Sequence, residues 1–298
     1  MEQLFSLEYL VSILLSGISL GGQLALIAIG YTMVYGILRL INFAHGDVFM
    51  VAGLIMVYAS ASLPLYVSIP IVLVGTVLLG VLIESAAYRP LRSAPRMSVM
   101  ISAIGVSYLL ENLALYITGG LPQVYPDIPW ISDSVTILGA TTKRVTLITP
   151  VLTLFLVVVL VLLIRYTKIG MAMRAVSKDF ETSQLMGIKI NSVISMTFVI
   201  GSFLAAVGSL LYFSSYKSVI PTSGAMPGLK AFVAAVFGGI GSIPGAVVGA
   251  FIIGICENLI KSSTELSIFS DAFTFALLIL VLCVKPTGLF GEKTTDKV

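Results

Sequence analysis

The chain has 298 residues, of which 58% are hydrophobic and only 10% are charged, and its formal net charge is +3. A soluble domain carries about 25% charged residues, so this composition excludes a soluble globular protein. The seventeen Lys and Arg side chains occur singly or in short clusters, which excludes the basic stripe of a nucleic-acid-binding protein. A lipid bilayer fits as the solvent, because a membrane protein needs charge only in its loops and along polar paths.

Apolar runs that approach the roughly 20 residues of a membrane-spanning helix predict six uninterrupted spans. In chain order these runs cover residues 9–38, 67–88, 97–117, 147–166, 192–213 and 272–284. Two further apolar stretches, 43–63 and 228–260, are interrupted by polar residues or glycines, and discontinuous helices are expected there. The sequence therefore predicts an all-α integral membrane protein. Residues 1–298 are expected to form a single transmembrane domain, a polytopic bundle of about eight transmembrane helices with two discontinuous segments.

The basic clusters predict the topology, because Lys and Arg in short loops are held on the cytoplasmic side. The clusters are Arg89, Arg92 and Arg96, then Arg165, Lys168, Arg174, Lys178 and Lys189, and finally Lys285, Lys293 and Lys297. We therefore expect Arg92 and Lys178 in the cytoplasm and Trp130 in an external loop. The chain crosses nine times if residues 228–238 span the membrane and eight times if they re-enter. An N-terminus outside and a C-terminus inside requires an odd number.

The first discontinuous segment opens with a polar cluster that contains Asn42, His45, Gly46 and Asp47. In one interpretation Asn42 and Asp47 cap two half-helices and His45 satisfies a free carbonyl. In the other, the cluster lines a translocation path, where half-helix ends meet the charged groups of a solute near the middle of the membrane. Polar groups are costly in lipid, so both interpretations place these side chains against protein.

Polar side chains also occur inside two later spans, as the pairs Glu111 with Asn112 and Glu257 with Asn258. One interpretation is buried pairing, for instance of the two pairs with each other across helices. The alternative is proton coupling. That alternative would need a relay, and the chain offers one histidine and three isolated membrane carboxylates, of which Glu84 is the third.

The longest polar loop on the predicted cytoplasmic side covers residues 167–191. Asp179 suits an N-cap, Glu181 favours the positive end of a helix dipole, and Gly187 suits the C′ position. A short helix along the membrane surface is therefore expected. Its apolar members either pack against the protein's own helix ends or form a docking surface for a cytoplasmic motor subunit. These apolar members are Val176, Phe180, Leu185 and Met186.

The second discontinuous segment is rich in glycine. Its candidates for a helix break and for close packing are Gly238, Gly239, Gly241, Pro244, Gly245 and Gly249. Gly241, Gly245 and Gly249 recur every four residues, which predicts one helix face that a neighbouring backbone can approach closely. Pro244 suits the start of that helix and leaves residues 238–242 as an unwound turn.

Four stretches carry a family resemblance. They are residues 39–47 (RLINFAHGD), the loop 174–188, residues 237–245 (FGGIGSIPG) and residues 285–291 (KPTGLFG). In this order they resemble the Liv-type permease subunits of ABC importers for branched-chain amino acids. The resemblance implies a translocation path for leucine, isoleucine and valine. It also implies a second homologous permease subunit, two cytoplasmic ATPase subunits and an extracytoplasmic solute-binding protein as partners. Related permeases for urea or short amides share the pattern and remain an alternative.

Catalysis by the chain itself is not expected. No G-x-x-x-x-G-K-[ST] motif occurs, so ATP should be bound by partner subunits, and no cofactor is predicted here. Cys256 and Cys283 have no second Cys or His at ligand spacing, so no metal site is predicted. An intramembrane enzyme is disfavoured, because it would need a nucleophile paired with a base and the sequence shows no such pair. An ion-coupled secondary transporter is disfavoured because it would not need a motor-docking loop. We expect a non-catalytic multi-pass protein of the cell (inner or plasma) membrane.

Overall fold

The computed structural model describes residues 7–92, 94–137, 139–263 and 265–291. Its long helices are α1 Leu7–Leu38, α2 His45–Ser62, α3 Leu65–Ile83, α4 Arg96–Thr118, α6 Arg144–Tyr166, α9 Ile190–Tyr216, α11 Ile243–Ser262 and α12 Ser270–Val284. Shorter helices are α5 Pro129–Ser132, α7 Lys168–Lys178, α8 Phe180–Leu185 and α10 Ala225–Gly238. A π-helical turn, Glu84–Tyr88, extends α3, and a 3₁₀ turn, Ser267–Phe269, precedes α12. Two short antiparallel pairs join β1 Gln123–Val124 to β4 Ser218–Val219, and β2 Ser134–Ile137 to β3 Ala140–Lys143.

Eight helices in the described part of the chain are long and apolar enough to cross a membrane, which confirms the all-α polytopic fold. Both interruptions are present as well. The first is the non-helical segment 39–44 between α1 and α2, and the second is the turn 239–242 between α10 and α11. The polar cluster is divided by the first interruption: Asn42 lies in it, whereas His45, Gly46 and Asp47 form the first turn of α2. Arg39 ends α1 in a left-handed conformation with φ of 54°.

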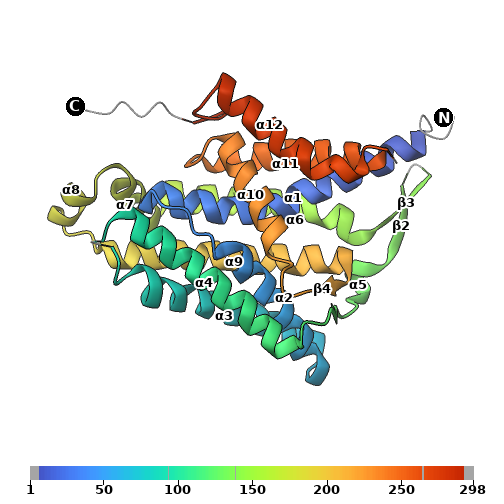
Figure 1. Ribbon diagram of the computed structural model, residues 1–298, viewed down its shortest axis with the longest axis horizontal. Helices are drawn as coiled ribbons and strands as arrows, with labels where there is room; N and C mark the ends of the chain where they lie inside the picture. The colour runs from blue at the N-terminus through green and yellow to red at the C-terminus, as the bar shows by residue number, and fades with distance from the viewer. Residues whose placement is uncertain (1–6, 93, 138, 264, 292–298) are drawn as a thin grey trace.

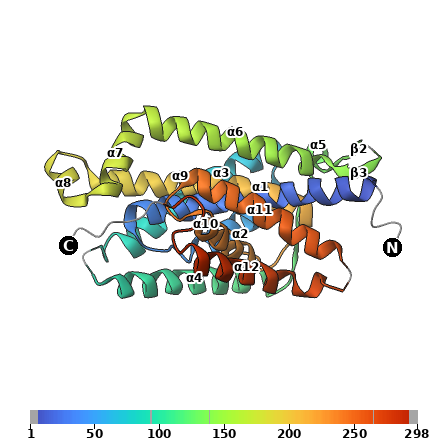
Figure 2. The same ribbon diagram turned by 90° about the horizontal axis from the view of Figure 1, so that it is seen from above.

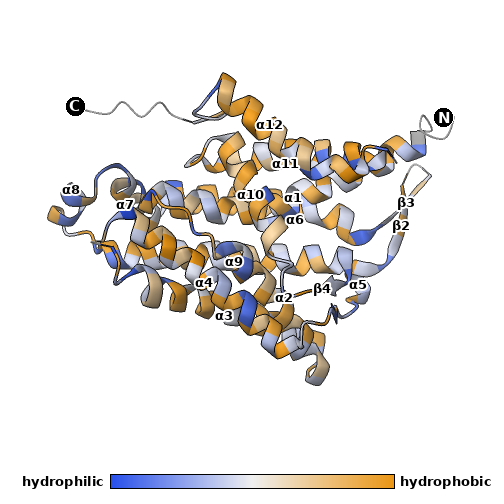
Figure 3. Ribbon diagram, in the orientation of Figure 1, coloured by the Kyte–Doolittle hydropathy of each residue, from blue (hydrophilic) through white to orange (hydrophobic). Residues whose placement is uncertain are grey.

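The helices form a bundle around α1, which packs against α9, α10 and α11 as well as α6. The two edges of the bundle are α4 and α6, as Figure 2 shows. Their outward faces expose large apolar side chains, among them Ile101 and Val151. Hydrophobic colouring runs along the helices, and hydrophilic colouring gathers at α7 and α8 at one end (Figure 3). This is the surface expected of a protein whose long sides face lipid.

The start of α1, α5 and the β2–β3 pair lie at one end of the bundle, and α7 and α8 lie at the other (Figure 1). Trp130 in α5 and Lys178 in α7 are thus at opposite ends, as the predicted topology requires. The end with α7 and α8 is hereafter the predicted cytoplasmic end. Residues 217–238 connect the two ends, because β4 pairs with β1 whereas Gly239 lies against Gly291. Together with the eight longer helices, the described part of the chain therefore runs between the two ends nine times, an odd number.

Close backbone packing joins α10 to α11. A β-carbon on Gly249 would lie 2.9 Å from the backbone nitrogen of Gly238, and one on Gly245 would lie 3.1 Å from the carbonyl carbon of Gly238. The prediction of a three-glycine helix face is wrong for Gly241, which lies in the turn before α11 with φ of 97°. Its position there requires glycine for the backbone conformation rather than for packing. Pro244 is in the first turn of α11, as expected.

Candidate functional site

A cleft of about 290 Å³ lies where α2, α4 and α10 meet, with α1 behind it. Polar side chains form one part of its lining, and apolar side chains form the rest. The polar ones are Tyr31, Asp47, Ser107, Tyr108 and Glu111, and the apolar ones include Phe43, Ile104, Leu229 and Phe232. Among the described residues that line the cleft there is no lysine, arginine or histidine. The cleft therefore presents two carboxyl groups without a countercharge.

Asp47 is held at the cleft by both its own helix and a neighbouring one. It is the third residue of α2 and only 2% exposed. The Ser107 hydroxyl on α4 donates a hydrogen bond of 2.5 Å to its Oδ2. Glu111 follows Ser107 by one turn of α4, so both side chains share a helix face. A buried carboxylate is costly unless it is paired, so the cleft favours a ligand that carries positive charge.

Two helices begin at the same cleft. The N-cap of α2 is Ala44 and that of α10 is Gly224, and neither residue makes a side-chain hydrogen bond at its cap. Gly46 brings the two starts together, because a β-carbon there would lie 2.6 Å from the carbonyl oxygen of Gly224 and 3.1 Å from the Cα of Gly228. The positive ends of two helix dipoles therefore meet beside the carboxyl groups. Such ends favour a bound anion.

Asn42 and His45 do not line this cleft. The Tyr88 hydroxyl donates a hydrogen bond of 2.8 Å to Asn42 Oδ1, which ties the break to the end of α3. His45 is 3% exposed and packs between Gly30 of α1 and Gly201 of α9. The expectation that Asn42 and Asp47 cap half-helices is wrong, since Ala44 is the N-cap of α2. Of the four predicted path residues, Gly46 and Asp47 line the cleft.

Comparison with known proteins places this architecture in a family. Residues 13–282 match the family described as "Branched-chain amino acid transport system / permease component". The chain is 40% identical to the high-affinity branched-chain amino acid transport system permease protein LivH of Salmonella typhimurium, over 97% of this chain and 98% of that protein. The chain belongs to this permease family. It is 37% identical to BraD of Pseudomonas aeruginosa, over 96% of this chain and 97% of that protein. It is 28% identical to the ribose import permease RbsC of Haemophilus influenzae, over 90% of this chain and 83% of that protein.

The permease is thus a multi-pass protein of the inner membrane. The short surface helix that the sequence predicts in its cytoplasmic loop is α8. The backbone nitrogen and the hydroxyl of Thr182 donate to the Asp179 carboxylate at 3.1 and 2.5 Å, which confirms the N-cap. These hydrogen bonds hold the pKa of Asp179 below its usual range. Gly187 has φ of 82°, and the Ile188 nitrogen donates to the Ser183 carbonyl at 3.1 Å. That bond closes the C-terminus as the expected glycine C′ motif does.

The apolar side chains of the permease's loop divide into two groups. Leu185 and Met186 are 87% and 78% exposed, and Glu181 is exposed beside them. Val176 is 1% exposed, because it lies on the buried face of the preceding helix α7 together with Met173. Val176 therefore packs against the protein itself, which was the first of the two interpretations, and does not belong to a docking surface.

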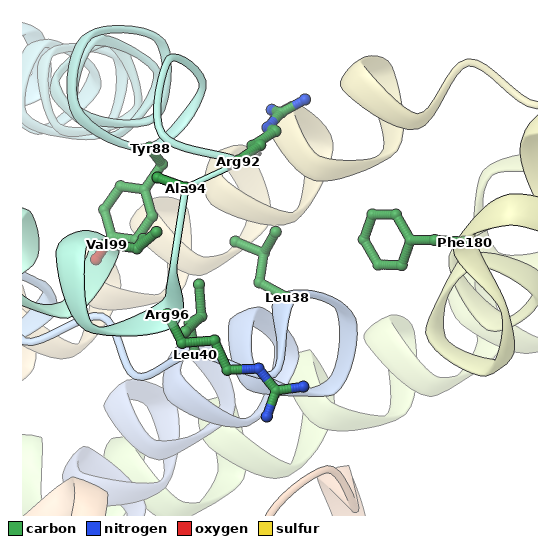
Figure 4. Close-up of a pocket in the computed structure, with 8 residues that line it drawn as sticks. All are labelled: Leu38, Leu40, Tyr88, Arg92, Ala94, Arg96, Val99 and Phe180. Carbon is green, nitrogen blue, oxygen red and sulfur yellow. The ribbon is translucent and has the colours of Figure 1, made fainter.

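Phe180 is 38% exposed, and its ring also lines a cavity of the permease. Its ring points across this cavity of about 340 Å³ toward Leu38, the last residue of α1 (Figure 4). Leu40 and Tyr88 line the far side of the same cavity. Tyr88 is also the hydrogen-bond partner of Asn42, which lies in the break between α1 and α2. The cavity therefore lies between the surface helix and this break.

The sequence interpretation missed a charge network around the buried Lys230 and Glu257 of the permease. Lys230 of α10 forms ion pairs of 2.6 Å with Glu257 of α11 and 2.7 Å with Asp271 of α12, and Lys261 pairs with Glu257 at 2.5 Å. The sequence had suggested that Glu257 is isolated, and the structure shows that it is paired. The neighbouring Asn258 donates from Nδ2 to the Ile13 carbonyl of α1 at 2.6 Å. The available signal was a single lysine in the apolar stretch 228–238, which should have a partner.

The other expected pairings also differ. Glu84 is not isolated, because it pairs with Arg92 and accepts a 2.8 Å hydrogen bond from the Ser195 hydroxyl. Asn112 lies on the exposed face of α4 and donates from Nδ2 to the Tyr108 carbonyl at 2.7 Å. Buried pairing is therefore confirmed for Glu257, although its partner is Lys230 rather than Glu111 or Asn112, and it is wrong for the exposed Asn112.

Proposed function

We propose that the chain is the membrane-spanning permease subunit of an ABC importer and that leucine, isoleucine and valine cross it through the Asp47 cleft. One observation carries the proposal: uncompensated carboxyl groups, two helix starts and apolar walls share one cleft. The ammonium group of an amino acid would pair with Asp47 and Glu111. Its carboxylate would meet the starts of α2 and α10, and its branched side chain would pack against Phe43 and Phe232.

The alternative solutes fit this cleft less well. Urea, short amides and sugars carry no positive charge, so they would leave both carboxyl groups uncompensated in a low-dielectric site. An ion-coupled secondary transporter is disfavoured for a different reason. Glu84 and Glu257, two of the three carboxylates that the sequence offered for a relay, are occupied in ion pairs.

The proposed assembly contains a second homologous permease subunit, two cytoplasmic ATPase subunits and an extracytoplasmic solute-binding protein. The exposed Leu185 and Met186 of the α8 region suit an apolar groove on an ATPase subunit. Phe180 would transmit movement of α8 to Leu38 and thereby to the break beside the cleft. ATP would be bound and hydrolysed by the partner subunits, and the permease itself would be non-catalytic and without a cofactor.

Solute identity is tested by ATP-driven uptake in proteoliposomes that contain the assembled complex. We expect labelled leucine to accumulate and labelled urea and acetamide to remain at background. Accumulation of urea or acetamide without leucine would overturn the proposed substrate class. Uptake driven by a proton or sodium gradient in the absence of ATP would overturn the transporter class.

Coupling is tested with Leu185→Asp and Phe180→Ala, with Met171→Ala as the matched control. Met171 is an apolar side chain of α7 that is 61% exposed and lies outside α8. We expect the first two variants to insert normally, because α8 lies outside the hydrocarbon, but to uncouple ATP hydrolysis from leucine uptake. Unchanged solute-stimulated ATPase activity and uptake in both variants would refute docking through α8.

A further inference from the structure

A second and larger pocket, of about 740 Å³, lies at the predicted cytoplasmic end between α1, α6, α7 and the α10–α11 turn. Four basic side chains from three places in the chain line it. They are Arg39 after α1, Arg165 in the last turn of α6, and Arg174 and Lys178 in α7. No carboxylate is among the described residues of the lining. The pocket therefore concentrates positive charge in one confined volume.

Two of the four basic groups donate to carbonyl oxygens. The Arg39 guanidinium donates to the Ser177 carbonyl at 3.5 Å, and that of Arg174 donates to the Arg165 carbonyl at 3.1 Å. Within the described part of the chain, none of the four forms an ion pair with Asp or Glu. Like charges around a shared volume repel one another, so an anion bound between them would be stabilised.

One further feature of the pocket favours an anion. The opposite wall is the start of α11, where the Ser242 hydroxyl accepts a 3.2 Å hydrogen bond from the Gly245 nitrogen. This wall is the positive end of a 20-residue helix, and it adds to the field of the four cations.

Apolar side chains form another part of the lining, and some of them come from an outer helix of the bundle. Val161 and Ile164 belong to α6, one of the two outer edges of the bundle, and Ile243 begins α11. A site with cations at the cytoplasmic end and aliphatic side chains toward the hydrocarbon matches the phosphate and the acyl chain of a phospholipid. Basic pockets between helices on this side of a membrane are suited to anionic head groups.

We propose that this pocket binds the phosphate head group of an anionic phospholipid of the cytoplasmic leaflet, with an acyl chain along α6. The site lies away from the Asp47 cleft and does not depend on which solute the permease carries. A phosphate group is the recognised chemistry, and the lipid rather than free phosphate is its source. The bound lipid would fix the ends of α1, α6 and α7 relative to one another beside α8.

The test uses the full chain in phosphatidylcholine nanodiscs with increasing phosphatidylglycerol, followed by native mass spectrometry and thermal unfolding. We expect one retained phosphatidylglycerol and a midpoint that rises with its content. Arg165→Gln and Lys178→Gln should each raise the apparent dissociation constant about fivefold, in line with the contribution of one basic residue near an anionic surface. Arg89→Gln is the matched control, because Arg89 is exposed in another basic loop and does not line the pocket.

Three results would overturn the proposal. An equal effect of Arg89→Gln would show diffuse attraction to the surface rather than a site. Displacement of the lipid by millimolar inorganic phosphate would assign the pocket to a soluble anion. Loss of the retained lipid on addition of the ATPase subunits, with protection of Arg165 and Lys178 by them, would assign it to a protein partner.

Discussion

Two clusters of charged side chains lie on different sides of α10, and they are built in opposite ways. On the side toward α11 and α12, Lys230 is bonded to Glu257 and Asp271, and positive and negative groups are matched. On the side toward α2 and α4, Asp47 and Glu111 face a cleft that has no basic residue among its described lining. One helix therefore separates a neutralised cluster from an uncompensated one.

The difference follows from the cost of charge away from water. Breaking a buried ion pair leaves an unpaired charge that costs about 3–5 kcal/mol, so a matched cluster holds its helices together. A cluster without a basic partner contributes no ion pair to the stability of the empty protein. It becomes favourable only when a solute supplies the missing charge, which is the expected property of a transport path.

The largest effect is expected from the matched cluster. Glu257→Leu leaves Lys230 with only the half-exposed Asp271 and removes the partner of Lys261. The variant should lose about 3 kcal/mol of stability, measured as a lower thermal midpoint in detergent. Lys230→Met combined with Glu257→Leu should be less destabilised than the sum of the two single variants. Additive losses would show that the pair is not a unit.

The next effect concerns the backbone contact between the start of α2 and the start of α10. Gly46→Ala places a methyl group 2.6 Å from the Gly224 carbonyl oxygen, so the starts of α2 and α10 must move apart. We expect a loss of about 2 kcal/mol together with reduced leucine uptake. Gly105→Ala is the control, because a β-carbon there meets nothing within 4 Å in the described structure. Normal stability and uptake in Gly46→Ala would argue that the cleft does not depend on this approach.

The uncompensated cluster should respond in function rather than in stability. Asp47→Asn removes the charge but can still accept the hydrogen bond from Ser107. The maximal rate of leucine uptake should fall about tenfold, or about 1.4 kcal/mol, while the thermal midpoint stays equal or rises. The half-saturating concentration should change little, because the binding protein would set it. A lowered midpoint with an unchanged maximal rate would make Asp47 structural.

The smallest effect separates adjacent positions of α4. Glu111→Gln should lower the maximal rate about threefold, equivalent to about 0.7 kcal/mol, because Glu111 lies at the cleft beside the more deeply buried Asp47. Asn112→Ala should leave uptake and stability within error, since Asn112 is exposed and bonds only to the Tyr108 carbonyl of its own helix in the described structure. Uptake measured for both variants at equal protein content decides whether the cleft or the helix as a whole matters.

The fold and one surface helix could be predicted because their signals are local. Apolar length identifies a spanning helix, and the caps of α8 involve residues within a few positions of each other, Asp179 with Thr182 and Ser183 with Ile188. The same holds for Pro244 at the start of α11. Local signals failed where the packing of a helix decides which of its apolar side chains are buried. Val176 is apolar like Leu185, and only the packing of α7 buries one and leaves the other exposed.

By itself, the sequence determined the bilayer as solvent, about eight spans, two interruptions and the short capped helix α8, because composition, periodicity and capping act over a few residues. The tertiary structure alone decided which polar residues meet. Asp47 and Ser107 are 60 positions apart, Lys230 and Glu257 are 27 apart, and Asn258 and Ile13 are 245 apart. A charge in a membrane must be judged by its partners. Whether a carboxylate is matched like Glu257 or left for a ligand like Asp47 depends on helix packing that no local pattern records.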